Sequence, residues 1–125
     1  MTDHASDHAT LVDRYIAAWN ATDAGARRAL VAATFAPDAS YLDPVMQGNG
    51  HAGIDGMIAG LQQRFPGHVF RRGDTLDAHH DHLRFSWELA PKDGEAIVKG
   101  TDFAVLSGDS RLAAVTGFFD LVPSA

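Results

Sequence analysis

Apolar residues recur with the spacing of an α-helix in three segments of the first half of the chain. Five residues between Leu11 and Trp19 form one apolar stripe, which predicts an amphipathic helix over residues 7–19. Cap-forming residues and a second apolar stripe predict a helix over residues 24–34, and a third stripe, ended by a Pro-Gly pair, predicts one over residues 54–65. The first two helices should form a helical hairpin.

Apolar and polar residues alternate along the second half of the chain with the period of two that is typical of β-strands. The clearest case runs from Leu83 to Leu89, where every second residue is apolar, so one face of the sheet should pack under the helices. A short strand over residues 39–43 precedes a glycine-rich stretch, residues 47–53, which we expect to be a loop. The four later strands are predicted at residues 68–78, 81–90, 95–107 and 111–122.

This order of elements predicts an α+β fold of three N-terminal helices packed on a curved, mainly antiparallel sheet. A sheet that curls around a helix leaves a cone-shaped space between them, so we expect an internal cavity of the kind that binds small molecules. At 125 residues the chain has the length of one domain, expected to span residues 8–125 after a flexible tail, residues 1–7.

The charge of the chain argues against nucleic acid as a partner, because the formal net charge is −6 and the ten Lys and Arg residues are scattered. No apolar run approaches the ~20 residues that span a bilayer, and the polar, acidic start does not resemble a signal peptide. We therefore expect no membrane partner and a cytoplasmic location. The absence of cysteine excludes thiol nucleophiles and thiolate ligands.

Three polar residues lie in apolar stretches, where burial of a polar side chain costs free energy unless the group is hydrogen-bonded or has a function: Tyr15, Asp43 and Asp102. If its strand turns Val98 and Ala104 inward, Asp102 also points inward, where burial should raise its pKa and keep it protonated as a hydrogen-bond donor. Tyr15 would be a second donor to the same ligand oxygen, which makes an oxyanion hole. Asp43, nearer the cavity mouth, should be ionised and act as the base.

Each of these three residues also has an ordinary structural explanation. Tyr15 could be a core tyrosine with a satisfied hydroxyl group, and Asp43 could end a strand at the turn that Pro44 begins. If the strand parity is reversed, Asp102 could instead form a salt bridge with Arg72, Arg84 or Lys99.

The predicted cavity should bind a small apolar molecule without a metal or another cofactor. The residues assigned to contact with this substrate are apolar and mostly aromatic: Trp19, Phe35, Met57, Phe65, Trp87 and Phe119. Three histidines lie between His79 and His82, but spacing fixes no further ligand near them, so we expect a hairpin turn rather than a metal site. His4 and His8 lie in or beside the expected tail and predict no metal site either.

Three motifs give the chain a resemblance to a known group of proteins. RYIAAWNATD contains Tyr15, the Asp-Pro-Val step begins at Asp43, and GTDFAVL contains Asp102. Over residues 8–122 the chain resembles the nuclear transport factor 2-like superfamily, whose fold is a cystatin-like cone, and especially its SnoaL-like and ketosteroid-isomerase-like members. The resemblance implies cofactor-independent isomerisation next to a carbonyl, with Asp43 as proton shuttle and Tyr15 and Asp102 as oxyanion donors.

The chain also departs from that pattern. The second helix is about one turn longer than expected for those isomerases, and Trp19 replaces a smaller aliphatic residue, so the pocket should differ from a steroid site. Related epoxide hydrolases use an Arg and an Asp two residues apart on one strand. Here Ser86 stands two residues after Arg84, and Gly117 stands where the acid of the last strand would be, which argues against that chemistry.

Other functions are open on the same fold. Asp120 could serve a cyclase-like site or cap the edge of the sheet. The cavity could store or sense an apolar ligand without catalysis. The outer face of the sheet could form a homodimer, as relatives of this shape often do, and a homodimer is the oligomer that we expect.

Overall fold

The computed structural model of the protein describes residues 4–123, and it contains the three predicted helices in the predicted order. They are α1 (His4–Asn20), α2 (Ala24–Thr34) and α3 (Gly50–Arg64). The first helix begins at His4, inside the segment that was expected to be a flexible tail, and residues 1–3 of that segment lie outside the described residues. The start of α2 is fixed by Asp23, whose carboxyl accepts a hydrogen bond from the backbone N–H of Ala26 at 2.9 Å.

The prediction of a loop over residues 47–53 was wrong. Residues 47–49 form a short strand, β2 (Gln47–Asn49), which pairs antiparallel with β1 (Phe35–Leu42), and α3 begins directly after it. Gly50, at the start of α3, has a φ of 71°, which a glycine adopts without strain and which turns the chain from strand into helix. The strand is too short and too rich in glycine for its own pattern to reveal it, because its stability comes from pairing with β1.

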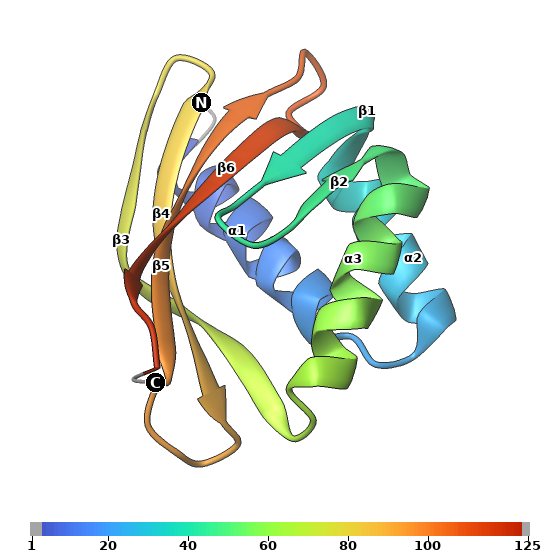
Figure 1. Ribbon diagram of the computed structural model, residues 1–125. Coiled ribbons are helices and arrows are strands. Elements are labelled where there is room, and N and C mark those ends of the chain that lie inside the picture. The colour runs from blue at the N-terminus through green and yellow to red at the C-terminus, as the bar shows by residue number, and fades with distance from the viewer. Residues whose placement is uncertain (1–3, 124–125) are drawn as a thin grey trace.

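The sheet has six strands in the order β2-β1-β6-β5-β4-β3 and does not close into a barrel. Its long strands are β3 (His68–His79), β4 (His82–Pro91), β5 (Val98–Leu106) and β6 (Leu112–Leu121). All neighbours pair antiparallel except β1 and β6, which are parallel, so the sheet is mixed but mainly antiparallel, as predicted. Figure 1 shows the helices on one side of this sheet, where α1 contacts β3 and α3 contacts β1.

The core lies between the sheet and the helices. Side chains from both layers meet there with no exposed surface, among them Val12, Val31, Ile54 and Phe85. The predicted alternation on β4 is confirmed, because Leu83 and the three residues at every second position after it are buried. This alternation turns one face of the sheet toward the helices and leaves the other face outside.

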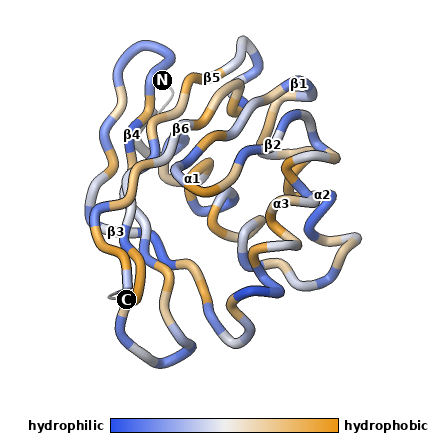
Figure 2. The backbone as a smooth tube through the Cα atoms, in the orientation of Figure 1, coloured by the Kyte–Doolittle hydropathy of each residue, from blue (hydrophilic) through white to orange (hydrophobic). Residues whose placement is uncertain are grey.

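The segment from His79 to His82 forms the expected hairpin turn between β3 and β4, and it is hydrophilic in Figure 2. Within residues 4–123, no group of three His, Asp or Glu side chains is placed to hold a metal ion. The side chain of His4 is outside what the structure describes. No described helix is long and apolar enough to cross a membrane.

Candidate functional site

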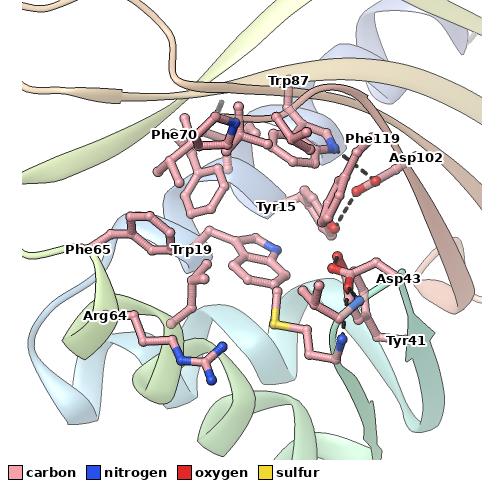
Figure 3. A pocket seen from close by; sticks show the side chains of 18 residues that line it. Tyr15, Trp19, Tyr41, Asp43, Arg64, Phe65, Phe70, Trp87, Asp102 and Phe119 are labelled. Atoms are coloured by element: carbon pink, nitrogen blue, oxygen red, sulfur yellow. Dashed lines mark hydrogen bonds between the residues drawn. The ribbon is translucent and has the colours of Figure 1, made fainter. Parts of the chain in front are cut away.

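A cavity of about 290 Å³ opens between the sheet and the helices (Figure 3). The three polar residues singled out from the sequence, Tyr15, Asp43 and Asp102, all line it. Its other walls are mainly apolar and aromatic, and four of the six residues predicted to contact a substrate belong to them: Trp19, Phe65, Trp87 and Phe119. The structure thus brings one phenol and two carboxyl groups from distant parts of the chain to a single apolar cavity.

Phe35 and Met57, the other two residues predicted to contact a substrate, do not line this cavity. Phe35 is fully buried behind the ring of Tyr15, with the two ring centres 5.8 Å apart. Met57 packs against the core as a partly buried residue of α3. Helical spacing correctly placed both side chains on an inward face, but it does not separate a residue that fills the core from one that borders a cavity.

Asp102 is the most deeply placed acid, with 1% of its surface exposed. It shares the inward face of β5 with Val98 and Ala104, as the two-residue period predicted. The Tyr15 hydroxyl donates a hydrogen bond to Asp102 Oδ2 at 2.6 Å, and the Trp87 indole N–H donates to Oδ1 at 2.9 Å. Both donors are neutral groups on aromatic rings.

No cation among the residues that the structure describes pairs with Asp102. The three basic residues considered for a salt bridge on the opposite face bind other acids: Arg72 pairs with Asp13, Arg84 with Asp77 and Lys99 with Glu88. The alternative in which the parity of β5 is reversed is therefore wrong. A buried carboxyl without a cation is costly to ionise, and its protonation state becomes sensitive to its few neighbours.

Burial raises the pKa of Asp102 to about 6, and the hydrogen bonds from Tyr15 and Trp87 limit this rise. The nearby carboxyl of Asp43 raises it further. Burial, followed by the charge of Asp102, raises the pKa of Tyr15 well above its usual value, so its phenol keeps the proton that it donates. Asp102 is consequently a carboxyl that can both take up and release a proton near neutral pH.

Asp43 follows β1 directly and is 7% exposed, so it is less buried than Asp102. Its Oδ2 accepts a hydrogen bond from the Tyr41 hydroxyl at 2.6 Å, and its Oδ1 accepts from the backbone N–H groups of Val45 at 2.9 Å and Met46 at 3.0 Å. The carboxyl thus orders the turn that Pro44 begins, as the structural explanation held, and it also lines the cavity.

Tyr41 was not predicted as a site residue, although it stands two residues before Asp43 and so should share its side of an extended segment. It lines the cavity beside that residue, and burial raises its pKa, so the phenol remains a donor. The signal for it was present in the two-residue spacing of Tyr41 and Asp43. What the sequence could not give was the direction of the hydroxyl group.

Gly117 on β6 lies between the two acids, and this role was also missed. A Cβ atom at this position would be 2.8 Å from Asp102 Oδ1, 3.2 Å from Asp43 Cβ and 3.5 Å from the Tyr41 hydroxyl. Gly117 pairs with Asp102 across β5 and β6, while β1 runs parallel on the other side of β6. A glycine here allows the carboxyls of Asp43 and Asp102 to approach each other over the strand.

Gly100 has a similar effect on Trp87. A Cβ at Gly100 would clash with Cζ2 of the Trp87 indole, so the absence of a side chain lets this ring lie across β5 and reach Asp102. The two glycines leave space on the inner face of the sheet in which the Asp102 carboxyl and the Trp87 indole can meet.

The oxyanion hole expected from the sequence does not have the predicted arrangement. Tyr15 and Asp102 were expected to donate to one ligand oxygen, but the Tyr15 hydroxyl donates to Asp102 itself.

Asp120 lies outside the cavity on the exposed face of β6, where it accepts a hydrogen bond from the Thr101 hydroxyl at 2.8 Å. The structure therefore does not place Asp120 for a cyclase-like role within this cavity.

Comparison with known proteins agrees with this architecture. The family model of the SnoaL-like domain matches residues 12–115. A suggested isomerase of the SnoaL-like family from Agrobacterium tumefaciens is 42% identical, with 92% of this chain and 98% of that chain covered and a TM-score of 0.88. No curated protein matches the chain.

Two more distant solved structures share the fold. One is a suggested polyketide cyclase from Sinorhizobium meliloti, 20% identical, with 86% of this chain and 93% of that chain covered and a TM-score of 0.67. The other is a protein with a cystatin-like fold from Nostoc punctiforme, 14% identical, with 96% and 94% covered and a TM-score of 0.66. The family match, the closely similar Agrobacterium structure and the cystatin-like architecture lead to one conclusion: this chain belongs to the SnoaL-like family.

Proposed function

We propose that the protein is a cofactor-independent enzyme that transfers a proton next to the carbonyl group of a small apolar molecule, as an isomerase or a cyclase does. The observation that carries this proposal is the carboxyl of Asp102, which lines an apolar cavity with a pKa raised to about 6. A general acid or base works best when its pKa is near the working pH. The Agrobacterium relative, 42% identical, has a suggested isomerase activity in the same family.

In the proposed isomerisation, Asp102 removes a proton from the carbon between a carbonyl and a carbon-carbon double bond. The double bond then moves into conjugation with the carbonyl, and Asp102 returns the proton to the far carbon, so the product is an isomer of the substrate. Tyr15 and Trp87 fix the carboxyl in one orientation through their hydrogen bonds.

Asp43 was predicted from the sequence to be the proton shuttle, and it is the second candidate for this step. Three hydrogen bonds donated by Tyr41, Val45 and Met46 already hold its carboxyl. We assign the proton transfer to Asp102 because its pKa is raised to about 6, and we give Asp43 the roles of shaping the cavity and raising the pKa of Asp102.

The test is turnover of a β,γ-unsaturated ketone, followed by the ultraviolet absorption of the conjugated product, together with deuterium uptake from heavy water. We expect Asp102→Asn to lose at least ~100-fold of the rate, as removal of a general acid-base group does. Asp120→Asn, on the exposed sheet face, is the matched control and should keep the wild-type rate.

Equal rates for wild type and Asp102→Asn would refute the assignment. If Asp43→Asn abolishes turnover while Asp102→Asn retains it, the roles are those that the sequence first suggested.

A second candidate is a protein that binds an apolar ligand without catalysis. It is favoured by the fact that both carboxyls are already hydrogen-bonded by the chain itself, as expected of groups that only shape a cavity. This candidate predicts that Asp102→Asn keeps the affinity for a ligand and that no ligand hydrogen exchanges with heavy water. Native mass spectrometry of the purified protein would identify a retained ligand.

We also propose that two copies of the chain associate through the outer face of the sheet. Phe103 on β5 and Phe118 on β6 are 46% and 52% exposed on that face, and their ring centres are 5.8 Å apart. Val105 extends this apolar surface. Such a patch is typical of an interface that a second molecule covers.

The cytoplasmic location stays a prediction from the sequence.

A further inference from the structure

The indole N–H of Trp19 is a buried donor without an acceptor. Trp19 lies on α1 with 4% of its surface exposed, and its ring lines the cavity. Its Nε1 atom makes no hydrogen bond. A buried N–H that gives up its hydrogen bond with water costs free energy unless another acceptor replaces the water.

The other buried side-chain donors of the cavity are all used. Tyr15 and Trp87 donate to Asp102, and Tyr41 donates to Asp43. Among the buried side chains that the structure describes around this cavity, the Trp19 N–H is therefore the donor that a ligand could engage without breaking a hydrogen bond of the protein.

The orientation of the Trp19 ring is fixed by its neighbours. Its centre lies 5.4 Å from that of Tyr41, 5.3 Å from that of Phe70 and 6.1 Å from that of Tyr15. Figure 3 shows the nitrogen edge of the indole turned toward the side of the cavity that holds Tyr15 and the two acids. The N–H lies close enough to the Tyr15 hydroxyl to lower the pKa of that phenol, but the contact does not have the geometry of a hydrogen bond.

We infer that Trp19 Nε1 donates a hydrogen bond to an oxygen of the ligand, and that this contact selects an apolar molecule with a carbonyl over the matching hydrocarbon. The inference deepens the proposed function, on which it rests for the identity of the oxygen as a carbonyl. It gives the ligand oxygen a donor that Tyr15 does not supply, because the Tyr15 hydroxyl is engaged with Asp102. The apolar walls would bind both molecules, so only the oxygen contact distinguishes them.

The test compares the binding of 2-acetylnaphthalene and 2-ethylnaphthalene, which have nearly the same shape and differ in the carbonyl oxygen, by equilibrium dialysis. Wild type should bind the ketone more tightly. Trp19→Phe removes the N–H and keeps an aromatic ring, so it should lower the preference for the ketone over the hydrocarbon roughly three- to tenfold. Val98→Ala, in an apolar wall residue on β5, should change both affinities by the same factor and leave the preference intact.

A second measurement needs no variant that might fold poorly. The chain has two tryptophans, so its indole N–H region in a ¹H–¹⁵N spectrum contains two signals. The Trp19 signal should move on addition of the ketone and stay nearly in place on addition of the hydrocarbon, while spectra of Trp87→Phe identify which signal is which.

The inference fails if wild type shows no preference for the ketone, if Trp19→Phe keeps the full preference, or if both ligands move the Trp19 signal alike. These outcomes are independent of catalysis. A lost preference in Trp19→Phe together with no turnover in wild type would support the oxygen contact and refute the enzyme. Turnover in wild type together with an unchanged preference in Trp19→Phe would support the enzyme and refute the oxygen contact.

Discussion

Asp102 links the chemistry of the cavity to the stability of the protein, because a buried acid with a raised pKa affects both. Its hydrogen bonds come from a phenol and an indole, which orient the carboxylate but do not cancel its charge. The energetic cost of ionising it therefore remains in the folded state. At a pH at which such a group is charged, it lowers the stability of the folded protein. At a pH near its pKa, it can exchange its proton and take part in catalysis.

The first prediction concerns pH and stability. The pKa of Asp102 is about 6 in the folded protein and 3.8 as its ordinary value, so the folded state binds more protons between these two values. The stabilising contribution of this group to the free energy of unfolding is full below about pH 4, and about 3 kcal/mol of it is lost as the pH rises through about 6 to neutral. The Asp102→Asn variant should not lose this stability, because an amide does not ionise in this pH range.

Chemical denaturation of both proteins between pH 4 and pH 7 measures this effect, because acids that do not interact with Asp102 cancel in the comparison. The stability of Asp102→Asn relative to wild type should rise with pH across that window. A difference that does not change with pH would show that the Asp102 pKa is not raised.

The second prediction separates the two roles of Asp43. Asp43→Ala should lower the free energy of unfolding by roughly 1–3 kcal/mol, because the Tyr41 hydroxyl and two backbone N–H groups lose their acceptor. Asp43→Asn keeps an oxygen for the turn and should cost less than about 1 kcal/mol. Urea denaturation checks both values, and equal losses in the two variants would contradict a role of Asp43 in ordering the turn.

At the level of single residues, the sequence predicted three of the important groups and missed others for a clear reason. Tyr15, Asp43 and Asp102 could be found because each interrupts an apolar pattern. The N–H groups of Trp19 and Trp87 could not, because an aromatic residue in an apolar stripe looks the same whether its polar edge meets a carboxyl, a cavity or neither.

Among the elements, β6 is the strand that brings the two acids together. It lies between β1, which ends next to Asp43, and β5, which carries Asp102. Since Asp102 is already held by two hydrogen bonds, its carboxyl cannot easily move away from an added atom on β6. The spacing of the acids thus depends on a position without a side chain, Gly117.

The third prediction follows from this contact. Gly117→Ala should destabilise the protein by roughly 1–3 kcal/mol through overpacking, and it should reduce turnover because the Asp102 carboxyl is displaced. Gly108→Ala is the matched control, since a Cβ at Gly108 meets no atom within 4 Å. Thermal unfolding of both variants measures the effect, and similar stabilities would contradict the close contact at Gly117.

The sequence predicted the elements well where the pattern is long. The predicted ranges of α2 and of the four long strands agree with the structure to within a few residues. The errors lie at β2 and at the starts of β1 and α3, where the pairing of β1 with β2 and β6 decides the conformation. These contacts join residues that local periodicity does not relate to one another.

At the scale of the whole molecule, the two faces of the sheet have different tasks. The inner face carries the cavity and its acids, whereas the outer face presents aromatic side chains to solvent. The fold class could be predicted because three helices followed by alternating strands have few compact arrangements. The sheet order could not, since β1 and β6 meet through a parallel pairing that no turn between them indicates.

The fourth prediction concerns the oligomer. Wild type should sediment as a dimer at micromolar concentration, whereas Phe118→Lys should sediment as a monomer, because a charge in the apolar patch opposes its burial. Gln63→Lys introduces the same charge at an exposed position of α3 and should leave the dimer intact. A wild-type protein that is monomeric in this experiment would contradict the proposed interface.

The place of β6 in the sheet also affects how the protein folds. Because β6 follows β5 in sequence but pairs with both β1 and β5, the strands β3, β4 and β5 can pair before β1 and β2 join the sheet. Contacts between such distant segments generally slow folding. Both halves of the sheet join only when β6 inserts between them, so the ability to bind a ligand should arise late in folding and in a single step.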